Sequence, residues 1–268
     1  MSSGNPVEER NAEPATSFAG TEAAACVGVG TTDDGSGFDE TDEYDELLAA
    51  LGRTEEEDER IAIHEAGHAV CARLLGHPLG GATVDPDPNG KYGGLVWGPR
   101  HSVAFGKNDD ADDVPELCDK LRTLMPQDGE TRSDAADVYL HALNCCIELA
   151  AASVAERMLL AGEPVPSDSD VEHTIKYASL VCRSPEAAQR FIRLCETMAD
   201  DLLRPYGYAL VALSTVLRIR RTLSGEEIDN VIATTVAGFE LAGEQARRRR
   251  WQHRVANADR FESEALQR

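Results

Sequence analysis

Two histidines, His64 and His68, stand four residues apart and enclose Glu65 in the segment His64-Glu65-Ala66-Gly67-His68. On an α-helix this spacing places both imidazoles on one face, about 5–6 Å apart at Cβ, so that they can share one metal ion. Neutral imidazole is a good zinc ligand, and the glutamate beside the first histidine can accept a proton from water without binding the metal. The pattern H-E-x-x-H is therefore typical of zinc metallopeptidases, in which the metal lowers the pKa of water and the glutamate acts as the base.

The alternative interpretation is that His64 and His68 are surface histidines on an acidic helix. The residues around them are largely apolar: Ile61, Ile63, Ala66, Ala69 and Val70. Unpaired imidazoles and a carboxylate would be costly in such a buried-looking stretch, so we favour the metal site. Gly67 costs roughly 0.5–1 kcal/mol relative to alanine inside a helix, and we expect it to let another element approach closely.

Two histidines do not complete a catalytic zinc site, which normally has three protein ligands and a water molecule. His77, nine residues beyond His68, is one candidate for the third ligand. The remaining histidines are His101, His141, His173 and His253. Carboxylates are so numerous that spacing alone does not choose among them.

The elements that must position these residues are mainly helices. Thr54 and Glu57 form a capping-box pattern, which predicts a helix from Thr54 to the break at Gly76-His77-Pro78. Helical spacing predicts further helices over 132–160, from Ser167 to about Cys182, and over 185–203, 208–220 and 225–240. Two short strands are predicted at 82–84 and 94–97, separated by turn-forming residues, and the acidic residues 107–116 are predicted to be loop. The expected fold class is mainly α, with a small β-sheet next to the active-site helix.

Charge divides the chain into three regions. The net charge of the 268 residues is -22, and residues 1–59 hold 17 Asp and Glu against 2 Arg. We expect residues 1–50 to be a disordered acidic tail that does not bind DNA, and 51–240 to be the folded domain. Residues 244–268 hold 7 Arg against 4 acidic residues, so 241–268 is interpreted as a solvated, Arg-rich helix or tail. Nucleic acid is not an expected partner.

Cysteine content and hydropathy point to a cytoplasmic setting. The seven cysteines form no C-x-x-C pair, which indicates buried thiols in a reducing compartment. No run of about 18 apolar residues predicts a membrane span, and no secretory signal precedes the domain.

Residues 61–75 resemble the active-site helix of the FtsH-type zinc peptidase domain. The resemblance covers about 58–237. It includes 81–84 and 88–97, similar to the family's strand–turn–strand, and 149–156, similar to its Ala-rich helix. It also includes 167–172, similar to the segment that supplies an Asp ligand, and 222–228, similar to the start of its last helix.

This resemblance implies His64 and His68 as zinc ligands, Glu65 as base and Asp170 as third ligand. Asp168 takes the place of Asp170 if the alignment shifts by two residues. A helix cap formed by Ser169 and Glu172 would leave Asp170 free to bind the metal.

The chain also departs from that family. It contains no G-x-x-x-x-G-K-[ST] motif and no membrane anchor. It also contains an acidic insertion at about 107–135.

We therefore expect a stand-alone zinc metalloendopeptidase that cleaves unfolded or partner-delivered proteins. A separate AAA ATPase could deliver substrate, and the family resemblance also allows a homo-oligomer. Substrate would lie extended along 94–97, with Trp97 in the core and not in a substrate pocket. Two alternatives remain: a cytoplasmic H-E-x-x-H protease that cleaves one regulatory protein, and a non-catalytic, metal-containing binding module.

Overall fold

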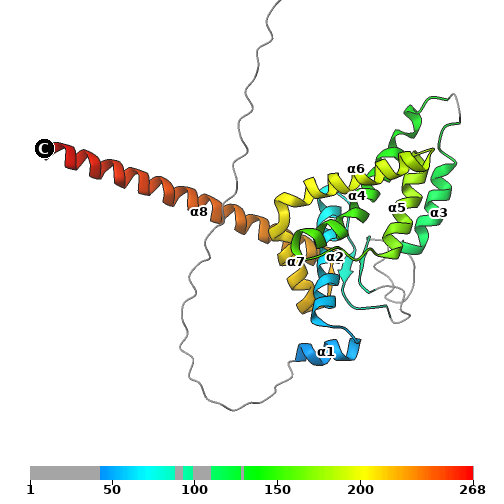
Figure 1. The fold of residues 1–268 in the computed structure, drawn as a ribbon, viewed down its shortest axis with the longest axis horizontal. Helices are drawn as coiled ribbons and strands as arrows, with labels where there is room; N and C mark the ends of the chain where they lie inside the picture. Colours follow the sequence, from blue (N-terminus) through cyan, green and yellow to red (C-terminus); the bar gives the residue numbers. More distant parts are fainter. Residues whose placement is uncertain (1–42, 88–92, 99–109, 128–129, 268) are drawn as a thin grey trace, which may run out of the picture. The chain divides into compact units, whose positions relative to one another are not determined.

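The helix that carries the histidine pair, α2 (Glu55–Leu75), begins and ends where the sequence predicts. The Thr54 hydroxyl accepts a hydrogen bond from the Glu57 backbone N–H at 3.2 Å, and the Glu57 carboxylate accepts from the Thr54 N–H at 2.8 Å. Gly76 ends the helix in the left-handed conformation, with φ of 80°. These features come from a computed structural model that describes residues 43–87, 93–98, 110–127 and 130–267 (Figure 1).

Helices make up most of the described chain, which confirms the predicted fold class. The other helices are α1 (Glu43–Leu51), α3 (Asp110–Arg122), α4 (Ala136–Leu159), α5 (Asp168–Val181), α6 (Pro185–Leu203), α7 (Gly207–Arg220) and α8 (Gly225–Leu266). Single 3-10 turns, Ser133–Ala135 and Arg204–Tyr206, precede α4 and α7.

A small antiparallel sheet of three strands lies beside α2 in the described structure. Its order is β2-β1-β3, so β2 stands at one edge, and Ala82 in the central strand is opposite Val96 and Leu223. The first two strands were predicted, whereas the third was interpreted only as the start of the last helix. The strands are β1 (Gly81–Thr83), β2 (Leu95–Trp97) and β3 (Thr222–Ser224).

The core forms where α4 packs against α2, α5 and α6. A Cβ on Gly67 would lie 2.8 Å from the Ala151 carbonyl oxygen and 2.9 Å from the Ala155 Cβ. Glycine at this position therefore allows α2 and α4 to pack with their backbones close together, as expected from the sequence. By length and hydropathy α4 could also cross a membrane, but here it is a packed core helix.

Three sequence predictions about the elements were wrong. Residues 110–116 belong to α3 and not to a loop, because Val114, Cys118 and Leu121 recur at helical spacing and pack on the core. Residues 43–50 of the predicted tail lie in α1, whose Leu48 is buried, while 1–42 lie outside the described residues. The last helix continues 26 residues beyond the predicted end at Glu240, to Leu266, so that the region interpreted as an Arg-rich helix or tail is a helix up to this residue.

Candidate metal centre

The two histidines of α2 converge on the first turn of α5. The Asp170 Oδ2 lies 3.1 Å from the His64 Nε2 and 3.3 Å from the His68 Nε2. One ligand atom from each of these three residues lies within 4.8 Å of the other two, so the group could hold a metal ion. Around a tetrahedral zinc ion with bonds of 2.0–2.2 Å, ligand atoms are separated by about 3.3–3.5 Å. The two observed separations are therefore close to those that zinc requires.

The outer nitrogen of each imidazole meets an acceptor on α4. The His64 Nδ1 lies 2.8 Å from the Glu156 Oε1, and the His68 Nδ1 lies 2.9 Å from the Glu148 backbone oxygen. Because both acceptors need a proton on Nδ1, each ring presents its Nε2 lone pair toward Asp170 once the Nε2 proton is released. Metal-binding histidines are typically oriented in this way by a carboxylate or a backbone carbonyl. The donor set therefore fits a divalent cation with an affinity for imidazole.

Glu156 is the residue that sequence reasoning missed. Its side chain is 1 % exposed, and it also accepts hydrogen bonds from the Arg60 guanidinium at 3.0 Å and the Val165 backbone N–H at 3.1 Å. Burial raises its pKa, but the hydrogen bond from His64 and its other donors lower the pKa more, so that the net shift is downward. The sequence offered one signal for this residue, a carboxylate within the Ala-rich stretch 149–156. A charge in such a buried stretch needs partners.

The site is electrostatically suited to a cation. Burial lowers the pKa of His64, yet the Asp170 and Glu156 carboxylates raise it to about 10. Burial raises the pKa of Asp170, yet the charges and hydrogen bonds of His68 and His64 bring it below its usual range. A metal ion bound here would take the place of the proton that these carboxylates hold on the imidazole, so binding would release protons.

Glu65, on α2, lies beside this group and next to Gly94, the residue that precedes strand β2. Its side chain is 6 % exposed, and burial raises its pKa to about 7. A Cβ on Gly94 would lie 2.6 Å from the Glu65 Oε1 and 2.9 Å from the Ile61 Cγ2. Only glycine therefore lets the chain pass this carboxylate on its way into β2.

The half-buried Trp97, at the other end of β2, packs on strand β1. A Cβ on Gly81, the first residue of β1, would lie 2.8 Å from the Trp97 Cε2 atom. This placement agrees with a packing role for Trp97.

A buried ion cluster holds the chain on both sides of the β1–β2 connection. The Arg53 guanidinium donates to the carbonyl oxygens of Val84 at 2.6 Å and Gly93 at 2.5 Å. Arg53 also pairs with Asp58, which is fully buried and is bound by two nitrogens of Arg221 at 2.7 and 2.9 Å. This cluster, which the sequence did not predict, fixes the backbone next to Gly94.

The structure also places the alternative ligand candidates. Asp168 is exposed at the start of α5 and lies outside the histidine group. The predicted cap by Ser169 and Glu172 is wrong: Ser167 is the N-cap and accepts from the Asp170 backbone N–H at 3.5 Å. The His77 Nδ1 instead contacts the Glu148 Oε2 at 2.5 Å. Of the remaining histidines, His101 lies outside the described residues, and His141, His173 and His253 belong to no metal-binding group in the described structure.

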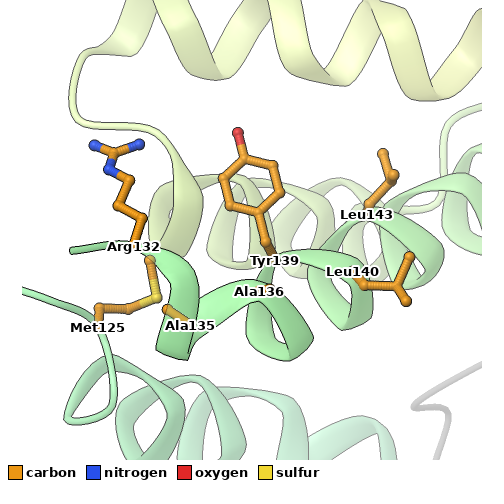
Figure 2. A pocket seen from close by; sticks show the side chains of 7 residues that line it. All are labelled: Met125, Arg132, Ala135, Ala136, Tyr139, Leu140 and Leu143. Carbon is orange, nitrogen blue, oxygen red and sulfur yellow. The ribbon is translucent and has the colours of Figure 1, made fainter.

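A separate pocket of about 350 Å³ lies at the opposite end of α4 from Glu156. Figure 2 shows that the Arg132 guanidinium and the Tyr139 hydroxyl point the same way above mainly apolar side chains. The lining residues are Met125, Arg132, Ala135, Ala136, Tyr139, Leu140 and Leu143. None of them belongs to the metal-binding group, so this pocket has no part in the candidate centre.

Comparison with known proteins does not assign the chain to a family: no family model matches it, and no curated protein matches its sequence.

Proposed function

We propose that this chain is a zinc-dependent metalloendopeptidase of the type that the FtsH resemblance implies. The observation that carries the proposal is the convergence of His64, His68 and Asp170, with both outer imidazole nitrogens held by acceptors on α4. Two imidazoles and one carboxylate form a ligand set that leaves a fourth position on zinc for water or substrate. Such an open site is the kind that catalyses hydrolysis.

The chain's own residues supply the proton transfers. Bound zinc would supply Lewis acidity that polarises a peptide carbonyl and lowers the pKa of water. Glu65 accepts the proton of the attacking water and returns it to the amide nitrogen as the C–N bond breaks. A carboxyl group with a pKa of about 7 can both accept and donate a proton near neutral pH, which suits this double role.

Substrate would bind in an extended conformation along β2. This strand lies at one edge of the described sheet. Gly94, the residue before it, passes Glu65 so closely that a Cβ at this position would lie 2.6 Å from the Glu65 Oε1. Adding a strand to this edge uses main-chain hydrogen bonds, which select for extended chains and not for particular side chains. We therefore propose unfolded protein segments as substrates, delivered where necessary by a separate AAA ATPase.

The proposed setting is the reducing cytoplasm. The six described cysteines are all free, and four of them are buried: Cys71, Cys118, Cys146 and Cys195. Free, buried thiols are expected in a reducing compartment.

The test is digestion of an unfolded protein such as casein by the purified chain loaded with zinc. We expect cleavage that a chelator abolishes and zinc restores. Glu65→Gln should retain zinc but lose cleavage, whereas Glu163→Gln, the same change on an exposed side chain, should cleave normally. Stoichiometric zinc without cleavage by the wild-type chain would instead identify a non-catalytic binding module.

A further inference from the structure

The C-terminal half of α8 is exposed on all sides. Every residue from Arg247 to Gln267 is exposed, and no other described helix lies beside this half (Figure 1). Large apolar side chains nevertheless remain in it, with Trp251 61 %, Phe261 64 % and Leu266 82 % exposed. Most helical stability in proteins comes from the packing of one helix face against another element, so a partner that covers this half would stabilise it.

Part of this half follows the spacing of a helix pair, although Phe261 and Leu266 do not belong to the series. Trp251, Val255, Ala258 and Ala265 lie on one stripe, at intervals that alternate between four and three residues, and Glu262 completes the series. Alternation of four and three residues is the seam of a two-helix coiled coil. Arg248, one turn before Trp251, continues the same stripe. The stripe therefore carries one basic residue, Arg248, and one acidic residue, Glu262.

Charge reverses along this half of the helix. Residues 247–254 contain five Arg and no acidic residue, whereas 259–266 contain three acidic residues and one Arg. A parallel pair would place like charges side by side. An anionic membrane or a nucleic acid would attract the first part and repel the second. An antiparallel pair places each basic part beside an acidic part.

We propose that two copies of this chain pair through 247–266 of α8 as an antiparallel, two-fold symmetric dimer. With the symmetry axis between residues 256 and 257, Val255 of one copy lies level with Ala258 of the other. Arg248 of one copy and Glu262 of the other copy are then offset by only about 4.5 Å along the helix axis. Both copies bury the same apolar stripe, as a two-fold interface requires.

A charge exchange tests this pairing in the full chain. We expect sedimentation equilibrium to show a dimer at micromolar concentrations. Arg248→Glu should raise the dimer dissociation constant by about tenfold or more, because it places like charges together at two symmetric positions. Glu262→Arg should do the same, and the double variant Arg248→Glu/Glu262→Arg should restore the dimer. Arg249→Glu, the same change on the side of the helix away from the stripe, should leave it intact.

Three results would overturn the proposal. The first is a monomer throughout the micromolar range. The second is a dimer that Arg248→Glu leaves unchanged, since another surface would then form it. The third is a monomer that binds vesicles containing phosphatidylserine, or a DNA duplex, through α8. Val255→Glu gives an independent check of the apolar stripe, and it should yield a monomer.

Discussion

Replacing Glu156 by glutamine keeps the size of the side chain but changes what its two ends can do. One end faces the Nδ1 of His64 at 2.8 Å, and the other faces the Val165 backbone N–H at 3.1 Å and Arg60 at 3.0 Å. All three are donors when His64 is a ligand. The glutamine amide has one acceptor end and one donor end, so it cannot satisfy both sides.

Both orientations of the amide weaken metal binding. If the amide oxygen faces His64, the NH2 group meets the donors of Val165 and Arg60, and the buried side chain is displaced. If the NH2 group faces His64, the imidazole must accept at Nδ1, and its proton moves to Nε2, the atom that would bind the metal. Loss of such an orienting contact typically weakens metal affinity about 10–100-fold, or about 1.4–2.7 kcal/mol.

The assay is a competition titration of zinc against a chromophoric chelator, with wild type and Glu156→Gln compared at the same pH. Glu163→Gln is the matched control, because it makes the same change on an exposed side chain nearby. Circular dichroism establishes that the variants are folded. A folded Glu156→Gln protein with wild-type zinc affinity would refute the orienting role of Glu156.

Three further predictions concern packing and charge. Gly94→Ala should lower kcat/KM by about 10²-fold with zinc retained, because a Cβ would lie 2.6 Å from the Glu65 Oε1 and displace the base. The control is Gly98→Ala, whose Cβ would meet nothing within 4 Å and which should be as active as wild type. Equal activity of the two variants would show that the Gly94 contact does not position Glu65. Gly67→Val should lower the free energy of unfolding in urea by about 1–3 kcal/mol, because α2 and α4 must separate, and an unchanged denaturation midpoint would be inconsistent with their close contact. The hydrogen bonds from Arg221 and Tyr44 outweigh the effect of burial and hold the pKa of Asp58 below its ordinary value of 3.8, so the stabilisation by its carboxylate is present above pH 3.8 and is lost as the pH falls through the folded-state pKa. Asp58→Asn should lower the free energy of unfolding by about 3–5 kcal/mol at neutral pH, and urea titrations should show less destabilisation of this variant by acid. Equal stability of variant and wild type at pH 7 would refute the role of the Asp58–Arg221 pair.

Local spacing explains what could be predicted about the site. His64, Glu65 and His68 lie within one and a half turns of a single helix, so their relative positions follow from helix geometry. Asp170 is 102 residues from His68, and its proposed role came from family resemblance; the structure places it with both histidines. The caps and ends of α2 followed from Thr54 and Gly76 because capping depends on neighbouring residues.

Long-range packing explains what could not be predicted. Glu156 meets His64 across 92 residues, and the contact depends on how closely α2 and α4 pack. The Arg221–Asp58 pair spans 163 residues and involves a residue at φ of 64°, which no local pattern signals. Strand β3 has only three residues, and its pairing with β1 becomes visible only once α7 and α8 are in place.

The central claim is that His64, His68 and Asp170 bind a zinc ion that Glu65 uses for peptide hydrolysis. The most direct measurement combines zinc content with casein cleavage for wild type, Asp170→Ala and Glu65→Gln, each purified identically. We predict one zinc per chain and chelator-sensitive cleavage for wild type, greatly reduced zinc for Asp170→Ala, and full zinc without cleavage for Glu65→Gln. Wild-type zinc content in Asp170→Ala, or normal cleavage by Glu65→Gln, would contradict the account.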